Sequence, residues 1–356
     1  MTAAPHSQVF GHSDVEERDD GVPPQDGTHR ARQGAVPLDQ AREIATRIAT
    51  NIERVIEGKP DIVRLALVVM LAEGHLLIED VPGVGKTKLA KALARSIDCS
   101  VRRVQFTPDL LPSDVTGVSV YNQDTRDFEF KPGAVFANLV VGDEINRASP
   151  KTQSALLECM EERQVTVDGT TYKLESPFMV VATQNPIEME GTYPLPEAQR
   201  DRFTARVSMG YPDTRSELAM LGGHADHDPL EDLRPVSHAA EVRSLIASVA
   251  GVFVSPAVSS YIVELVAATR RSSELRLGGS PRSSLQLLRS AKAVAALAGR
   301  EYVLPDDVQQ LLGPVLCHRV ILTPEAQIAR RSANDIVADC MKRVPVPRSA
   351  PDQSVS

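Results

Sequence analysis

The residues with the clearest chemistry lie in LLIEDVPGVGKTKLAKAL, at positions 76–93. The pattern GxxxxGK[ST] places backbone N–H groups around phosphates, a lysine on the β/γ oxygens and a hydroxyl on Mg²⁺. Gly85, Lys86 and Thr87 complete this pattern, whereas Asp80 stands where its first glycine belongs. Because Asp tolerates turn conformations better than most residues, we expect the phosphate-binding function to survive this replacement.

The residues on either side of this loop indicate a strand and a helix. HLLIED supplies an apolar strand, and Leu89, Leu93 and Ile97 recur at the spacing of one helical face. A helix that starts directly after the loop points its N-terminus at the phosphates. The sequence therefore predicts a nucleotide site, to which Gly83 adds a second flexible point.

Two further strand ends carry polar side chains. LVVGDEINR ends an apolar run in Asp143 and Glu144. A P-loop NTPase needs one acid at a strand end to hold Mg²⁺ through water, and a second carboxylate to orient or deprotonate the attacking water. Successive side chains of a strand point apart, so this pair suits both roles. In VVATQNP, Asn185 either bonds the water and the γ-phosphate or simply forms a turn before Pro186.

The order of apolar patterns predicts an α/β domain followed by a helical one. Ile44, Ile48, Ile52 and Ile56 mark a helix over residues 38–56, and a second helix follows near 62–72. Strands then alternate with helices, which indicates βαβ units and a parallel sheet. After Pro212 we expect the strands to stop. The predicted strands are 76–78, 101–106, 138–141, 178–182 and 205–209; the predicted divisions are a disordered tail 1–36, a nucleotide-binding domain 37–212, a helical domain 213–345 and a tail 346–356.

Two β-hairpins are predicted inside the α/β domain. Asp168-Gly169 between alternating runs at 164–174 indicates a type I′ turn, and a second hairpin joins 118–121 to 128–130. A nucleic-acid translocase needs basic tips to hold phosphates. Here one tip is Asp-Gly and the other has two Asp to one Arg, which favours a protein substrate.

Composition excludes several classes of protein. The 356 residues are 4% aromatic with a net charge of −8, which argues against a base-stacking platform or a DNA-coating protein. No apolar run is long enough to span a bilayer, so we expect no membrane insertion. Four cysteines without CxxC spacing fit a reducing cytoplasm. We interpret His224-Ala-Asp-His227-Asp228 as a solvated loop and not a metal site.

Together these residues resemble the AAA+ ATPases, specifically the MoxR family. The resemblance covers about residues 38–343 and rests on four blocks in order: EGKPDIVRL…GVGKTKLAKALA, GDEINRASPKTQSALLECMEERQVTVDG, MVVATQNPIEMEGTYPLPEAQRDRF and GGSPRSSLQLLRSAKAVAALAGREYVLPDDV. It implies an αβα sandwich with a parallel sheet, a smaller all-helical lid domain, ATP and Mg²⁺ as ligands, and a homo-oligomeric, hexameric ring.

The resemblance also implies roles for individual residues. Asp143 and Glu144 match Walker B, with Glu144 as the catalytic base, and Asn185 matches sensor 1. Arg202 matches the arginine finger that reaches a neighbour's ATP, and Arg282 matches sensor 2 on the lid. The implied nucleotide contacts are Ile56 and Gly58 near the adenine, then Pro82, Gly83, Val84, Gly85, Lys86, Thr87 and Lys88 of Walker A, with Thr87 and Asp143 at Mg²⁺.

Alternatives stay open at the arginines and for the function. Arg200 stands where an aliphatic residue is expected, so it competes with Arg202 for the role of finger. Arg202 also fits a surface ion pair, and Arg282 an ordinary helix start. The resemblance implies a chaperone that remodels or activates a protein, with a von Willebrand factor A domain partner on another chain, or that assists metal insertion. The rivals are a metal-chelatase ATPase subunit, a nucleotide-gated scaffold and a nucleic-acid translocase.

Overall fold

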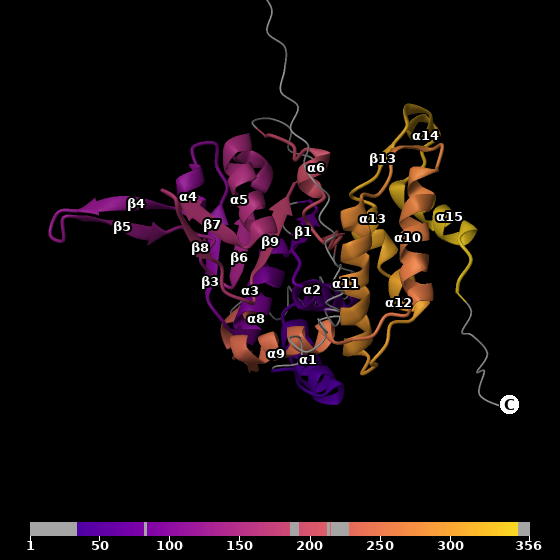
Figure 1. Cartoon of the computed structure of the whole chain (residues 1–356), viewed down its shortest axis with the longest axis horizontal. Helices are drawn as coiled ribbons and strands as arrows, with labels where there is room; N and C mark the ends of the chain where they lie inside the picture. Colours follow the sequence, from indigo (N-terminus) through magenta and orange to yellow (C-terminus); the bar gives the residue numbers. More distant parts are fainter. Residues whose placement is uncertain (1–33, 82–83, 186–191, 212–213, 215–227, 348–356) are drawn as a thin grey trace, which may run out of the picture.

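A five-stranded parallel sheet forms the centre of the first domain (Figure 1). The computed structural model describes residues 34–81, 84–185, 192–211, 214 and 228–347. Because all neighbouring strands are parallel, their carboxyl ends meet at one edge, where Asp143, Glu144 and Asn185 lie. In sheet order the strands are β10 (Ala205–Val207), β1 (Leu76–Glu79), β9 (Met179–Gln184), β6 (Leu139–Asp143) and β3 (Val101–Gln105).

Burial on both faces explains the near-continuous apolar runs of these strands. Every residue of β6 and of β9 is buried, as expected for the interior of a parallel sheet covered by helices. Leu76 and Ile78 of β1 belong to one hydrophobic cluster, and Leu77 between them belongs to the other. The five strands occur where the apolar runs predict them, within two residues at most ends.

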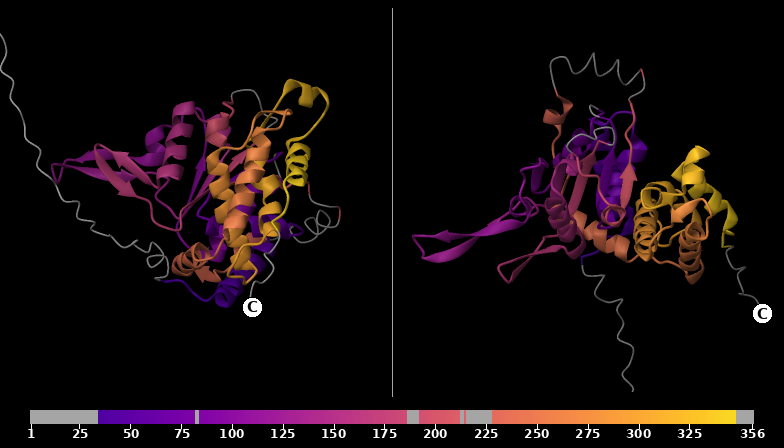
Figure 2. Two further views of the ribbon diagram at one scale, coloured as in Figure 1. Left: turned by 45° about the vertical axis from the view of Figure 1, so that its right-hand side comes forward. Right: turned by 90° about the horizontal axis from the view of Figure 1, so that it is seen from above.

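Helices cover the two faces of the sheet and complete the predicted sandwich (Figure 2). The first cluster joins the sheet to three helices of this domain and continues into the helices that follow β10, and the second joins the sheet to the other two. The first three are α1 (Leu38–Glu53), α2 (Pro60–Leu71) and α3 (Lys86–Ser96), and the others are α4 (Pro112–Thr116) and α5 (Pro150–Glu162); η2 (Ile145–Arg147) is a 3₁₀ turn before α5.

Both predicted hairpins are present and project from one side of the sandwich (Figures 1 and 2). They are β4 (Gly117–Asn122) with β5 (Asp127–Pro132), and β7 (Gln164–Val167) with β8 (Thr170–Lys173). Positive φ at Asp168 and at Gly169 confirms a two-residue turn of the predicted kind. The rings of Phe130 and Tyr172 stack at 4.0 Å, so the two hairpins support one another.

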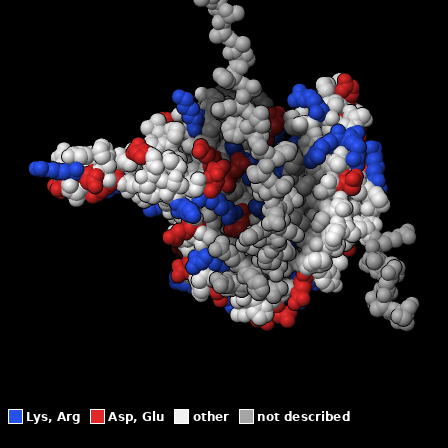
Figure 3. Space-filling model, in the orientation of Figure 1, with Lys and Arg blue, Asp and Glu red and all other residues white. Residues whose placement is uncertain are grey.

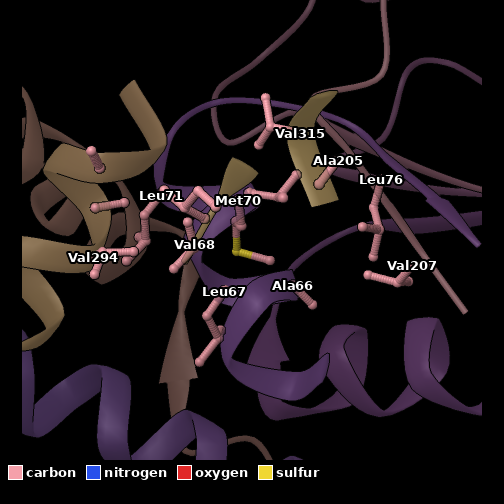
Figure 4. Packing of buried hydrophobic residues seen from close by; sticks show 14 of the residues in the cluster. Ala66, Leu67, Val68, Met70, Leu71, Leu76, Ala205, Val207, Val294 and Val315 are labelled. Atoms are coloured by element: carbon pink, nitrogen blue, oxygen red, sulfur yellow. The ribbon is translucent and has the colours of Figure 1, made fainter. Parts of the chain in front are cut away.

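A helical lid follows and packs against the β10 edge of the sheet. Its long helices α10 (Pro256–Arg270) and α11 (Pro281–Leu297) begin with proline behind a serine cap. In Figure 4, Leu71 of α2 lies beside Val294 of α11, and α2 thus joins both domains. The remaining lid elements are β12 (Leu275–Leu277), α12 (Pro305–Gln309), α13 (Leu312–Leu316), β13 (Ile321–Leu322), α14 (Pro324–Ile328) and α15 (Ala333–Arg343).

The expectation that strands stop after Pro212 is wrong. β12 pairs with β13, and β11 (Ser237–His238) pairs with β2 (Ile97–Asp98). Strands of two or three residues are too short to produce an alternating pattern. β11 and the neighbouring α8 (Pro229–Asp232) attach to the α/β domain, whereas α9 (Ala239–Ala250) contacts α1 and α2 as well as α11. Within the described segments, no helix is long and apolar enough to cross a membrane.

His75 is a buried link between three elements. The Val180 N–H donates to its Nδ1 at 3.0 Å, so Nε2 carries the proton and donates to the Met160 carbonyl at 3.0 Å. Burial lowers the pKa of His75 from 6.5 to about 4. The folded protein therefore keeps this imidazole neutral well into the acid range.

Acid should destabilise the fold through this histidine. The contribution of His75 to the free energy of unfolding is fully present above pH 6.5 and is lost as the pH falls towards 4. The reason is that this histidine binds a proton in the unfolded chain that it does not accept in the folded one. At 1.36 kcal/mol per pKa unit the loss approaches roughly 3 kcal/mol. Urea unfolding between pH 7.5 and about 4 should show a shallower decline for His75→Gln than for the native chain. Equal slopes would mean that folded His75 titrates near its ordinary pKa.

Candidate functional site

The lysine and glycine of the phosphate loop stand at the start of α3. Gly85 caps the helix with φ 89°, a left-handed conformation that suits glycine, and Lys86 is the first helical residue. Lys86 Nζ donates to the carbonyls of Asp80 at 2.6 Å and Gln184 at 3.3 Å. The ammonium therefore lies over the ends of β1 and β9, where the N-terminus of α3 also points. Pro82 and Gly83 lie outside the described residues.

The Asp80 side chain anchors the beginning of this loop through hydrogen bonds. The backbone of Asp80 is not left-handed, so a tolerance of Asp for left-handed turns does not explain why Asp is accepted at this position. Its carboxylate accepts from Ser208 Oγ at 2.8 Å and from the Gly210 N–H at 2.6 Å, both beyond β10. Burial raises the pKa of Asp80, but these hydrogen bonds and that of the Val81 N–H outweigh it and lower the pKa overall. The charged carboxylate ties the loop to the β10 side of the sheet.

Thr87 and Asp143, the two residues predicted to hold Mg²⁺, contact each other. The Thr87 hydroxyl donates to Asp143 Oδ1 at 3.0 Å, although the two residues come from α3 and from the end of β6. A hydroxyl and a carboxylate are oxygen ligands of the kind that Mg²⁺ takes, usually together with waters and substrate phosphates. The residues present therefore fit this ion.

Two more groups surround Asp143, and sequence reasoning missed both. Arg103 Nε of β3 donates to Asp143 Oδ2 at 2.7 Å, and Thr183 Oγ1 of β9 lies 3.4 Å from Oδ1. Arg103 thus balances a buried carboxylate. The two arginines of the VRRVQF run were the available signal, but only the strand order places Arg103 beside β6.

Glu144 has side-chain hydrogen-bond partners different from those of Asp143. Its backbone is left-handed, with φ 57° and ψ 51°, an uncommon and strained state for Glu. The Glu144 N–H donates to Thr183 Oγ1 at 3.0 Å and fixes this turn. Its carboxylate accepts from Gln105 Nε2 at 2.8 Å and from Arg147 at 2.9 Å. The structure therefore places this acid at the strand edge and holds it there.

Asn185 follows β9 at the same edge of the sheet. It is buried, and its carbonyl accepts from Asn146 Nδ2 at 3.5 Å. Because β9 lies between β1 and β6, Asn185 stands between the phosphate loop and the Asp143-Glu144 pair in sheet order. The predicted loop and strand-end residues thus gather at the carboxyl edge.

Arg202 and Arg282 gather at the opposite edge. Arg202 Nε donates to Glu161 Oε2 at 2.7 Å, and Arg282 pairs with the other oxygen of the same carboxylate. Glu161 lies in the last turn of α5. Two residues after Arg202, the Thr204 N–H donates to the His75 carbonyl, which places this segment at the amino end of β1. The two arginines therefore lie at the other end of the strand that carries their own phosphate loop.

A buried cation of the lid, Arg319, fixes the segment that carries Arg202. Arg319, whose side chain is 1% exposed, donates from Nε to Asp201 Oδ1 at 2.9 Å and from its terminal nitrogens to the carbonyls of Asp201 and Thr204. Asp201 also accepts from Ser280, the cap of α11, and from Arg282 at 3.5 Å. Nothing in the sequence around Arg319 indicated this role.

Arg200 differs from Arg202 in its surroundings. It ends the short helix α6 (Glu197–Arg200), and its buried Nε has no hydrogen-bond partner among the described residues. The ion pairs of Glu161 are with Arg202 and Arg282, and Arg200 is not among its partners. The arginine that the fold pairs with Arg282 is Arg202.

The other predicted nucleotide contacts lie in the turn after α1 and at the start of α3. Ile56 is buried in the turn between α1 and α2, and Gly58 has φ 71° there. Val84 packs on the core, and Lys88 forms an ion pair with Asp228 at 3.6 Å. A separate cavity of about 870 Å³ opens beside Asp80 and Val81, between α2, β10 and the lid, and Ile56 does not line it.

In the described ranges, no group of three or more His, Cys, Asp and Glu side chains could hold a metal ion. His224 and His227 of the HADHD segment lie outside the described residues.

Comparison with known families agrees with this geometry. Residues 75–205 match the model of the "ATPase family associated with various cellular activities (AAA)", and residues 267–340 match the AAA lid domain. The fold and the site thus define an ATPase of the AAA+ class.

Individual relatives narrow the class. The chain is 52% identical to the Bacillus subtilis protein YeaC over 84% of this chain and 94% of that one. It is 39% identical to Chaperone MoxR1 of Mycobacterium tuberculosis, covering 86% and 84% respectively. A crystal structure from Cytophaga hutchinsonii superposes with a TM-score of 0.81 at 37% identity, over 90% of this chain and 99% of that one. The chain belongs to the MoxR family of AAA+ ATPases.

Removal of the Asp80 carboxylate should weaken nucleotide binding. Asp80→Ala leaves the Ser208 hydroxyl and the Gly210 N–H without their acceptor and frees the first turn of the loop. Hydrogen bonds to a charged group contribute about 1.5–3 kcal/mol, so we expect the dissociation constant of a fluorescent ATP analogue to rise at least about tenfold. Asp80→Asn, which retains one oxygen, should show a smaller rise. Unchanged affinity in both would show that the loop holds its shape without this tether.

Proposed function

We propose that this chain hydrolyses ATP to ADP and phosphate in a homo-oligomeric ring and uses the energy to remodel or activate a protein client. The observation that carries the proposal is the Thr87–Asp143 contact, with Lys86, Glu144 and Asn185 at the same strand edge. The name Chaperone MoxR1 of the Mycobacterium tuberculosis relative supports a protein client.

Binding of the triphosphate would use the loop and the start of α3. Backbone N–H groups of residues 84–88, at the start of the helix, favour anionic oxygens, and Lys86 supplies the positive charge. Thr87 and Asp143 would hold Mg²⁺, which neutralises charge on the phosphates. Ile56 and Gly58 would lie near the adenine.

Glu144 would accept a proton from the attacking water while Asn185 orients that water and the γ-phosphate. The carboxylate now accepts hydrogen bonds from Gln105 and Arg147. Both donors bond the same oxygen, Oε2, so Oε1 can accept a hydrogen bond from the attacking water. Gln105 and Arg147 therefore hold the carboxylate in place while its second oxygen meets the water.

The stabilising arginines would come from a neighbouring subunit. Arg202 and Arg282 lie at the amino edge of the sheet, away from the phosphate loop of their own chain. A nucleotide at one subunit's carboxyl edge can receive them only from another copy, which favours a ring with shared sites. The hexameric number rests on the family resemblance.

The two hairpins are the candidate levers that act on the client. The tip of β4–β5 mixes both charge signs (Figure 3) and carries the exposed aromatic pair Tyr121 and Phe128. A tip of this kind offers a phosphate backbone little and a polypeptide side chain more, which disfavours the nucleic-acid translocase. We further propose a cytoplasmic location and a von Willebrand factor A domain partner or metal insertion as the purpose. A metal-chelatase ATPase would share this site.

Glu144→Gln should bind ATP and fail to hydrolyse it. The amide keeps the size of the side chain but does not accept the proton, so kcat should fall by about 10²–10⁴-fold. Phosphate release and equilibrium binding of a fluorescent ATP analogue measure the two properties separately. Retained turnover would assign the base elsewhere.

Mixed subunits test the shared site. Arg202→Ala chains retain their phosphate loops, and Lys86→Ala chains retain their arginines, so inactive preparations should regain activity when mixed. Loss of such an arginine can cost on the order of 10³–10⁵ in rate, which leaves a large window for recovery. The Arg202→Ala, Lys86→Ala double variant mixed with Arg202→Ala is the control. No recovery would point to Arg200 or to a site within one subunit.

A further inference from the structure

We propose that Glu161 is a positioning residue that holds Arg202 and Arg282 side by side for the nucleotide of the neighbouring subunit. This inference rests on the proposed function, because it takes the two arginines to act across a subunit interface. No sequence motif singled out Glu161.

The contacts of Glu161 are shared evenly between the two arginines. Oε2 accepts from Arg202 Nε at 2.7 Å, and Oε1 pairs with Arg282. The hydrogen bond from Arg202, followed by the charge of Arg282, lowers the pKa of this carboxyl despite its partial burial. One carboxylate thus bridges a guanidinium of the α/β domain and a guanidinium of the lid.

Without this bridge the two arginines would repel each other. Arg282 keeps only a long 3.5 Å contact with Asp201, and Arg202 has no other carboxylate partner among the described residues. Arg163 and Arg289 line the same small cavity and add positive charge; Glu73 pairs with Arg163. A negative group at position 161 is therefore what allows the pair to stay together.

The geometry leaves the arginines able to bind phosphate. Arg202 contacts Glu161 through Nε, and its two terminal nitrogens make no hydrogen bond in the described part of the chain. A guanidinium has five N–H donors, so Arg202 can keep Glu161 and still present a fork to phosphate oxygens. Glu161 therefore acts as a support for the arginines and not as a competitor of the nucleotide.

Glu161→Gln tests this role by the pattern of its kinetics. We expect kcat to fall about tenfold, since the arginine pair loses its order, while KM for ATP changes by less than about twofold, since the phosphate loop is untouched. The matched control is Glu162→Gln, whose exposed side chain has no ion pair among the described residues and which should turn over normally. An unchanged or higher kcat for Glu161→Gln would overturn the inference.

A mixing experiment separates positioning from a general effect on the fold. Glu161→Gln chains have intact phosphate loops, and Lys86→Ala chains offer correctly held arginines. The ATPase rate of this mixture should therefore exceed that of Glu161→Gln chains mixed with the Glu161→Gln, Lys86→Ala double variant. Equal rates in the two mixtures would mean that Glu161 acts within its own subunit, against the proposal. The Arg202→Ala and Lys86→Ala mixture is run alongside: failure there rejects the shared site itself, whereas success there with failure of Glu161→Gln rejects only the role of Glu161.

Discussion

The buried carboxylate of Asp143 is the point on which the arrangement of the site depends. A charge in the interior of a parallel sheet is costly unless other groups compensate for it. Here compensation comes from three directions, since Thr87 of α3, Arg103 of β3 and Thr183 of β9 all contact its two oxygens. The need to satisfy one acid thus fixes the phosphate-loop helix against three strands, and Glu144 inherits its position from the same strand end.

At the amino edge of the sheet the buried charge is positive, and it too is compensated by several groups. Arg319 is a buried cation whose donors are met by Asp201 and by backbone carbonyls around Thr204. Those acceptors belong to the segment that leads into β10, and Arg319 belongs to the lid, so the lid cannot shift without exposing unpaired donors. The lid and the arginine-bearing turn therefore form one body with the sheet edge.

Much of this could be predicted from the sequence, for identifiable reasons. The five strands appear as apolar runs because both faces are covered, and Asp168-Gly169 specifies a turn by its backbone alone. Lys86 and Thr87 were recognisable from the phosphate-loop pattern, and Asp143 and Glu144 from their place at the end of an apolar run. Arg103, Gln105, Glu161 and Arg319 were not, because each acts through a partner more than 35 residues away in the chain whose proximity only the tertiary fold creates. The reason given for Asp80 was wrong, since its side chain and not its backbone tolerance accounts for it.

The separation of the phosphate loop from the arginine pair, at opposite ends of the same strand, has a consequence for counting. If each catalytic centre takes one half from each of two chains, an isolated subunit has none and an open row of n subunits has n − 1. A closed ring has n, because closure alone completes the last centre. Two unmatched half-sites would mark the ends of every unfinished row, and each would favour the addition of another copy. Assembly and catalytic competence would then be a single event, governed by how much of this chain is present.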